Sequence, residues 1–249
     1  MKPEWFENFF DDDYIHFHDV YLPSELATKF EVAFIEKVLD LRKSNLVLDL
    51  GCGLGRITMP LAKRGIKVIG VDISPILLAH ARRHAEKNKN IKFIREDMRY
   101  LDFDQLFDKG FSAFSSFGYF KTRAEDNMVL ESISRSLKPK GLFLFDLPNK
   151  DFILNNFQKS ATFKKDGFIF TFKRFFERAD SVVKTKLTIS GKKRKIVKYM
   201  KIRLYNFNEL SAVLFRFNFH IEGVWSGVHS EKFDRYSSKR MFILVRKHK

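Results

Sequence analysis

The chain has 249 residues, with 46 Lys and Arg against 30 Asp and Glu, a net charge of +16, and a single cysteine. This length suits one large α/β domain, and a single thiol excludes an internal disulfide framework or a zinc site built from several thiolates. No apolar stretch approaches the roughly 20 residues that a membrane span needs. The acidic, aromatic N-terminus also lacks the basic segment and apolar core of a secretory signal. We therefore expect a cytoplasmic protein with no membrane partner.

The positive charge is concentrated in one part of the chain. Residues 151–205 contain 15 Lys and Arg and 4 Asp and Glu, so this segment supplies +11 of the total +16. A basic excess favours an anionic partner, but it is also typical of a well-solvated surface.

The first 150 residues alternate between helical and apolar segments. Residues 24–43 have the apolar spacing of a helix, with Ser24 as its N-cap. Strands are then expected at 45–50, 66–72, 91–97, 110–117 and 141–147, and helices at 54–64, 75–87 and 124–137. This alternation predicts a parallel sheet with helices on both faces.

After residue 150 the pattern becomes rich in β-strands. Three runs, 168–176, 181–189 and 195–205, are joined by short turns, which predicts an antiparallel meander. A helix at 207–216 and strands at 219–225 and 241–247 follow. The carboxyl ends of strands in an open α/β sheet face the ligand crevice, so the meander, inserted after the fifth strand, should cover the site.

A glycine-rich loop follows the first strand and opens a helix: Asp49-Leu50-Gly51-Cys52-Gly53-Leu54-Gly55-Arg56. Glycines there let the backbone turn tightly and approach a ligand closely. The G-x-G-x-G spacing, with an acid two residues ahead, differs from the G-x-G-x-x-G of dinucleotide binders. The G-x-x-x-x-G-K-[ST] pattern is absent, which disfavours hydrolysis of a nucleoside triphosphate.

Acidic residues end the first three strands. Asp72 ends the second strand, where a carboxylate can accept hydrogen bonds from ribose hydroxyls. Asp97 and Met98 end the third, where an oxygen and an apolar side chain suit an adenine ring. One such acid alone could be a helix N-cap, but three on consecutive strands, beside the glycine loop, favour a nucleoside site.

These motifs resemble those of class I S-adenosylmethionine-dependent methyltransferases, in particular the small-molecule branch (methyltransferase domain type 11/25-like). The resemblance is carried by residues 47–74, 95–99, 107–120 and 136–149, and by WFENFFDDDYI and RLYNFNEL near the two ends. One departure is Lys140, where the family usually has glycine, which should loosen that turn.

The resemblance implies a Rossmann-like fold, with a mostly parallel seven-stranded sheet, helices on both faces and an antiparallel β insert over the active site. It implies a single methyltransferase domain in four parts. These are an N-terminal helical cap (1–43), a cofactor-binding half (44–150), the basic insert (151–205), and a C-terminal helix with the last two strands (206–249).

The family also implies roles for individual residues, with S-adenosylmethionine as cofactor and S-adenosylhomocysteine as product. Gly51 and Gly53 would lie under the methionine moiety, with Asp49 facing its amino group. Asp72 would hold the ribose, and Asp97 and Met98 the adenine. The full expected set is Asp49, Gly51, Cys52, Gly53, Arg56, Asp72, Ile73, Asp97, Met98, Ser112 and Phe114.

Two classes of methyl acceptor are disfavoured because the sequence lacks the residues that their methylation needs. Methylation of base amines commonly uses an Asn/Asp-Pro-Pro-aromatic motif, but residues 115–119 here read SSFGY. Carbon methylation of cytosine needs a thiolate, and the only thiol, Cys52, lies in the cofactor loop. This favours an O or N atom of a small molecule. RNA bound by the basic insert, and a non-catalytic cofactor-binding protein, remain alternatives; the chain would be a monomer or homodimer.

Candidates near the acceptor are Tyr14, Tyr119, Asp146, Arg203, Tyr205 and His229, each of which could instead be structural. His16 and His18 have no third ligand at a suitable spacing, so no metal is expected. The phenylalanines at 163, 168, 170, 172, 175 and 176 are interpreted as core packing, with an apolar acceptor pocket as the alternative.

Overall fold

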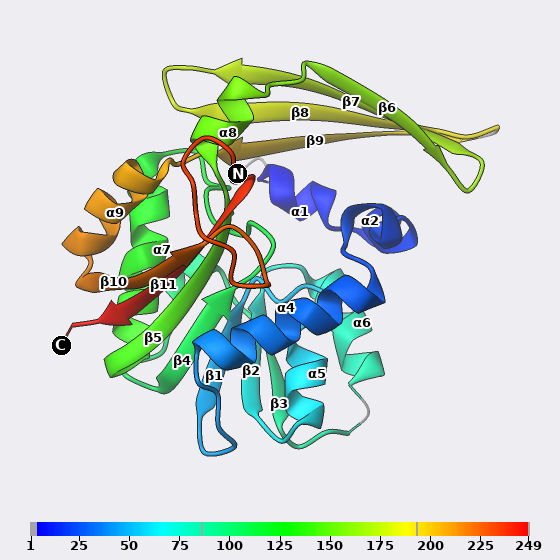
Figure 1. Ribbon diagram of the computed structural model, residues 1–249. Coiled ribbons are helices and arrows are strands. Elements are labelled where there is room, and N and C mark those ends of the chain that lie inside the picture. Colours follow the sequence, from blue (N-terminus) through cyan, green and yellow to red (C-terminus); the bar gives the residue numbers. More distant parts are fainter. Residues whose placement is uncertain (1–3, 86, 193, 249) are drawn as a thin grey trace.

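Seven strands form the central sheet of the computed structural model, which describes residues 4–85, 87–192 and 194–248 (Figure 1). The strands are β1 (Leu46–Leu50), β2 (Lys67–Asp72), β3 (Ile91–Arg95), β4 (Phe107–Ser112), β5 (Leu137–Pro148), β10 (Phe219–Trp225) and β11 (Arg240–Lys247). Their order is β10-β11-β5-β4-β1-β2-β3, and only β11 runs antiparallel to its neighbours. The expected mostly parallel seven-stranded sheet is confirmed.

Helices cover both faces of this sheet because the buried side chains of the inner strands point alternately to either side. On one face α4 (Glu25–Val38) and α5 (Thr58–Lys63) pack against Val47, Val68 and Phe111. On the other, α7 (Arg123–Ser136) and α9 (Phe207–Arg216) pack against Phe143 and Phe145. The remaining helix, α6 (Pro75–His84), packs against β2 and β3.

Several expected boundaries were wrong; the helix expected at 24–43, for example, ends at Val38. The fourth strand lies at Phe107–Ser112 rather than 110–117, because Phe114 and Ser115 have φ angles of 59° and 71°, a left-handed conformation that ends the strand. Helix α5 begins at Thr58 rather than 54, because the preceding residues are used by the glycine turn.

The insert is a separate antiparallel sheet of four strands, β6 (Ser160–Lys165), β7 (Phe168–Glu177), β8 (Val182–Ser190) and β9 (Lys195–Arg203). The sequence predicted three of them. The polar edge strand β6 lacks a clear apolar alternation, and it is paired through an Asp166-Gly167 turn in which both residues have positive φ. Helix α8 (Lys150–Asn155), also not predicted, connects β5 to this sheet.

Three short N-terminal helices lie between the insert and the central sheet: α1 (Trp5–Phe9), α2 (Asp12–His16) and α3 (His18–Tyr21) (Figure 1). The buried ammonium group of Lys198 on β9 donates to the Phe9 carbonyl at 3.3 Å and pairs with the Asp11 carboxylate. The ring of Phe17 packs edge-on against Phe168 and Phe170. The insert and the N-terminal helices therefore form one roof over the carboxyl ends of the strands.

The phenylalanine stripe of the insert is divided between its two faces. Phe170 is buried on the inner face, with Phe168 and Phe172 packed around it and Phe163 stacked on it at 5.1 Å. Phe175 points to the opposite face and is 63% exposed. The packing interpretation fits the inner residues, and none of the six lines the main pocket described below.

Within the part of the chain that the structure describes, none of the helices combines the length and apolar character required to span a membrane.

Candidate functional site

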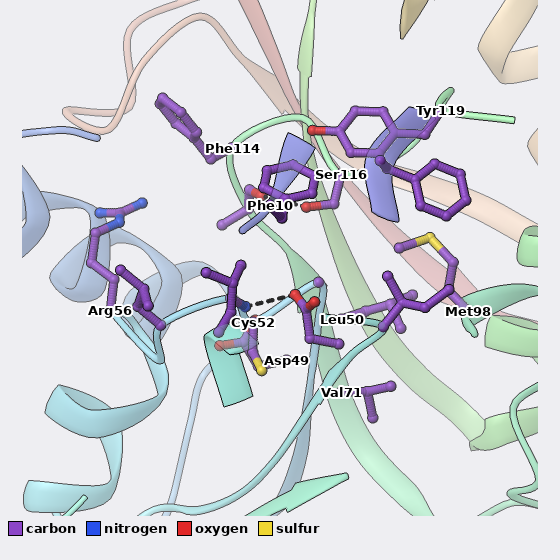
Figure 2. A pocket seen from close by; sticks show the side chains of 18 of the residues that line it. Phe10, Asp49, Leu50, Cys52, Arg56, Val71, Met98, Phe114, Ser116 and Tyr119 are labelled. Atoms are coloured by element: carbon purple, nitrogen blue, oxygen red, sulfur yellow. Dashed lines mark hydrogen bonds between the residues drawn. The ribbon is translucent and has the colours of Figure 1, made fainter. Parts of the chain in front are cut away.

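A pocket lies where the carboxyl ends of β1, β2 and β3 meet the N-terminal helices (Figure 2). Its floor is the glycine loop after β1, and its sides come from the segments after β2, β3 and β4. Ten of the eleven residues expected to contact a cofactor line it: Asp49, Gly51, Cys52, Gly53, Arg56, Asp72, Ile73, Asp97, Met98 and Phe114.

The glycine loop is held in a conformation that side chains disfavour. Gly51 and Gly53 have φ angles of +77° and +52°. The Gly51 amide donates to the Val71 carbonyl at 2.8 Å, which draws the loop onto β2. A Cβ atom on Gly51 would lie 2.5 Å from the Ser116 hydroxyl oxygen. The bare backbone is therefore required both by the turn and by the close approach of the segment after β4.

Asp72 braces this loop from the end of β2. One carboxylate oxygen accepts from the Gly53 amide at 2.8 Å, and the other from the Ser74 amide at 2.9 Å. Burial raises the pKa of this carboxyl, although the backbone hydrogen bonds oppose that effect. Asp72 therefore has a structural role, because it supports the turn, and it also lines the pocket, where it can contact a ligand.

Asp49 lies deepest. Its side chain is 2% exposed and accepts a hydrogen bond from the Thr58 hydroxyl at 2.5 Å. Burial raises the pKa of the Asp49 carboxyl to about 7, while the Thr58 hydrogen bond acts in the opposite direction. Asp49 consequently changes its charge near neutral pH.

This pKa predicts a pH-dependent affinity for a ligand that presents an ammonium group to Asp49. Only the ionised carboxylate attracts the cation, so affinity for S-adenosylhomocysteine should rise about tenfold between about pH 6 and pH 8. Calorimetric titration across this range measures it, and Asp49→Asn should flatten the profile. An equally steep rise in the Asn variant would place the titrating group elsewhere.

The far end of the pocket is formed by Glu96, Asp97 and Met98. The Asp97 carboxylate is held by Arg99, whose backbone amide and guanidinium donate to it at distances between 2.6 and 3.1 Å. Arg99 also pairs with Glu4 and Glu125, which anchors the N-terminal segment to α7. Asp97 is therefore fixed in position, and Glu96 is a second acid at this end that sequence reasoning did not select.

Aromatic side chains of the roof close the pocket. Phe6, Phe10 and Tyr14 come from the N-terminal helices, and Tyr119 and Phe120 from the segment after β4. Figure 2 shows the Tyr119 ring above Phe10 and Ser116, with its hydroxyl turned toward the pocket interior. Burial raises the pKa of the Tyr14 and Tyr119 hydroxyls, so both keep their protons at neutral pH.

Sequence reasoning missed Phe6 and Phe10 as pocket residues. The available signal was their i, i+4 spacing in WFENFF, which places both rings on one side of a helical turn. Nothing in that spacing indicated that this side would lie over the glycine loop.

The arginine that lines the pocket is already ion-paired, and the thiol is uncharged. The Arg56 guanidinium pairs with Glu31 and donates to the Thr28 hydroxyl at 2.9 Å. Burial raises the pKa of the Cys52 thiol, which keeps it protonated. The pocket thus combines carboxylates and aromatic faces with one arginine, Arg56, that is already ion-paired, and this environment favours a cationic ligand.

The structure does not bring four acceptor candidates and Ser112 to this pocket. Ser112 is buried within β4, and Asp146 lies behind the pocket wall, accepting from the Phe114 amide at 2.8 Å and from Arg240 at 2.6 Å. Arg203 and Tyr205 are buried against Asp126, at 2.9 and 2.7 Å. His229 is exposed beside Phe30.

Of the six acceptor candidates, only Tyr14 and Tyr119 line the pocket. Asp146, Arg203 and Tyr205 lie at or just after strand ends, and a sequence does not show the direction of such side chains. His229 lies in the loop between β10 and β11, away from the pocket. Among residues 4–85, 87–192 and 194–248 no three His, Cys, Asp or Glu side chains are grouped so that they could hold a metal ion. The absence of a metal stays a prediction.

Comparison with known proteins agrees with this geometry. The sequence model of the methyltransferase domain family matches residues 47–141. YqeM of Bacillus subtilis, named as a methyltransferase, is 35% identical over 121 residues, which are 48% of this chain and 49% of that protein. The ubiquinone biosynthesis O-methyltransferase of Coxiella burnetii is 30% identical over 131 residues, 52% of this chain and 54% of that one. The matched region thus spans about half the length of these relatives.

Solved structures resemble nearly the whole chain. A methyltransferase from Clostridium acetobutylicum described as S-adenosylmethionine-dependent has a TM-score of 0.79 at 18% identity, covering 94% of this chain and 99% of that one. The CcbJ methyltransferase of Streptomyces caelestis has a TM-score of 0.81 at 20% sequence identity, and the match covers 94% of this chain and 96% of that one. CalS10 of Micromonospora echinaspora, an amino pentose methyltransferase with S-adenosylmethionine bound, has a TM-score of 0.71 at 16% sequence identity. This match covers 95% of this chain and 97% of that one. Residues 47–141 are therefore similar to the methyltransferase domain family, and the chain as a whole has the fold of these solved methyltransferases.

Proposed function

We propose that this protein is an S-adenosylmethionine-dependent methyltransferase that acts on an O or N atom of a small molecule. One observation carries the proposal. One pocket joins the glycines at positions 51 and 53 to the carboxylates of Asp49 and Asp72 and to aromatic side chains above them.

The residues of the pocket fit this cofactor. The open backbone at Gly53, where an added Cβ would meet only Leu77 at 3.8 Å, leaves room for the methionine moiety. Asp72 would hold the ribose, and Ile73 and Met98 offer apolar surface for the adenine. A sulfonium and an ammonium group are cations, which suits the carboxylate of Asp49 and the faces of the aromatic rings.

When bound, the cofactor would supply a methyl group: its carbon–sulfur bond would break with the electron pair staying on sulfur, the acceptor's lone pair would form the new bond to carbon, and the proton that the acceptor gives up would pass to solvent when the product leaves. The protein's residues orient the acceptor and exclude water. The Tyr14 and Tyr119 hydroxyls, held protonated by burial, would donate hydrogen bonds to the acceptor rather than remove its proton.

A small acceptor is favoured over RNA by the orientation of the insert. Its lysines gather on the outer face, where Lys173 lies opposite Lys186 and Lys184 opposite Lys201. The inner face, which is apolar around Phe170, covers the site. RNA bound to the lysines would lie on the far side of the sheet from the pocket. The names of two relatives, a ubiquinone biosynthesis O-methyltransferase and an amino pentose methyltransferase, also support a small acceptor.

The proposal is tested by binding and turnover together. Asp72→Asn should weaken S-adenosylhomocysteine binding by about 1–3 kcal/mol, because charge-assisted hydrogen bonds to the ribose are lost. Calorimetry measures this, with Glu25→Gln on the exposed face of α4 as a matched control that keeps wild-type affinity.

Turnover is followed as S-adenosylhomocysteine released from S-adenosylmethionine in fractionated small-molecule extracts. Tight cofactor binding without product in any fraction would favour the non-catalytic alternative. Unchanged affinity in the Asn variant would remove Asp72 from the binding site.

A further inference from the structure

A second pocket lies between α8 and the inner face of the insert. Its walls are mostly apolar and include Phe152 and Phe157 on one side and Val183, Met200 and Ile202 on the other. A concave, mostly apolar site with a few polar groups is what proteins use to bind small organic ligands. The function of the first pocket leaves this second one unexplained.

One charged side chain, Arg174 of β7, lines the second pocket. Strands β7, β8 and β9 place two cations on the inner face, Arg174 and Lys198. Lys198 pairs with Asp11 and two backbone carbonyls. No described acidic side chain pairs with Arg174, whose guanidinium lies 5.1 Å from the centre of the Phe172 ring.

Burial is also the sole cause of a lowered pKa at Arg174, which means that no nearby carboxylate compensates for its partial desolvation. A cation that loses water without gaining a counter-ion is costly in the ligand-free protein. An anionic group in the pocket would remove that cost, and the planar guanidinium is well suited to bind a carboxylate or a phosphate through two hydrogen bonds.

Consecutive residues line the two pockets. Ser115 lines the second pocket, whereas its neighbours Phe114 and Ser116 line the first. The Ser115 backbone amide donates to the Asp146 carbonyl at 3.0 Å, and its hydroxyl accepts from Arg240 at 2.9 Å. A ligand that contacts Ser115 would therefore lie beside a segment that also lines the first pocket.

Met200 makes a second connection. It lines the second pocket and packs in the same apolar cluster as Phe10 and Tyr14, which line the first. Met200 therefore lies between a ligand in the second pocket and the aromatic side chains over the first.

We propose that the second pocket holds the body of the methyl acceptor, an apolar molecule bearing a carboxylate or phosphate group that pairs with Arg174. The binding of such an anion stands on the second pocket alone, while its role as acceptor rests on the proposed function. The acceptor's reacting O or N atom would lie at the end away from Arg174, toward Tyr14 and Tyr119.

The test uses two fluorescent probes with nearly the same ring system, anionic 8-anilinonaphthalene-1-sulfonate and neutral N-phenyl-1-naphthylamine. Arg174→Gln should weaken binding of the anionic probe about tenfold or more, as expected for a lost charge-assisted pair, and leave the neutral probe unchanged. Lys173→Gln removes the same charge from the neighbouring residue on the outer face and should leave both probes unchanged.

Competition then tests whether the anionic group itself is recognised. Phenylpropanoate or phenyl phosphate should displace the anionic probe from wild type, and phenylpropanamide should not. Arg174→Lys, which keeps the charge in a pocket of similar size, should retain selectivity for the anions if Arg174→Gln folds poorly by circular dichroism.

Equal probe affinities in Arg174→Gln and Lys173→Gln, displacement by the amide as strong as by the acids, or no binding of the anionic probe to wild type would each overturn the proposal. Binding of S-adenosylhomocysteine is measured in the same preparations. Loss of that binding in wild type would refute the proposed function, whereas anion selectivity at Arg174 without it would leave the second pocket as a binding site only.

Discussion

Replacing Asp126 with Ala should lower the free energy of unfolding by about 3–5 kcal/mol, because it leaves a buried arginine without its counter-ion. The Asp126 and Arg203 side chains are each 1% exposed and are joined at 2.9 Å. The same Asp126 oxygen accepts from the Tyr205 hydroxyl at 2.7 Å. This cluster fixes the end of β9 to α7, so its loss should also loosen the insert.

Urea denaturation followed by circular dichroism measures the effect. Asp126→Leu combined with Arg203→Met should recover most of the loss, since an apolar pair of similar volume often replaces a buried ion pair without cost. Glu25→Ala, which breaks the exposed pair with Lys29, should leave the unfolding midpoint unchanged. If Asp126→Ala lowered the free energy of unfolding as little as Glu25→Ala, other partners of Arg203 would be sufficient to stabilise its charge. One such partner is the Lys121 carbonyl, to which Arg203 already donates at 2.8 Å.

Replacing Gly51 with Ala should reduce affinity for S-adenosylhomocysteine by about tenfold to a hundredfold. An L-residue at the Gly51 φ of +77° costs roughly 1–2 kcal/mol. The new methyl would also lie 2.5 and 2.6 Å from the Ser116 side chain, so the loop or the segment after β4 must move. Both belong to the pocket wall, and the cradle would therefore change shape.

A matched control is available at Gly167. It also has a φ of +77°, but an added Cβ there would meet no atom within 4 Å, and it lies in the β6–β7 turn of the insert. Gly167→Ala should lose some stability while keeping wild-type affinity by calorimetry. Gly51→Ala with Ser116→Gly removes the clash and should recover part of the binding. Wild-type affinity in Gly51→Ala alone would contradict the assigned role of this loop.

The local part of the site could be predicted from the sequence because it lies in short motifs. Asp49, Gly51 and Gly53 follow one strand, and Asp72 and Asp97 follow the next two. In a parallel sheet, consecutive crossovers bring such strand ends to one edge, so chain order alone places these residues together. The glycines were informative for the same reason, since their positive φ angles are a property of the turn itself.

Contacts between distant segments could not be predicted in this way. Arg203 and Tyr205 looked like site residues by position, yet Asp126, about 80 residues earlier, holds them in the interior. Phe10 reaches the pocket only because the N-terminal helices fold back under the insert. The edge strand β6 was missed because its polar sequence is stabilised by pairing with β7 rather than by its own pattern.

The sequence by itself therefore determined the alternating α/β order, the glycine turn and the row of acids, since each depends on neighbours within a few residues. Only the tertiary structure decided which side chains face the two pockets, that Ser115 lines the second while its neighbours line the first, and that Arg174 lies in the second with no described acid beside it. These features depend on how the insert packs against α8, the N-terminal helices and the segment after β4, and no local periodicity encodes such contacts.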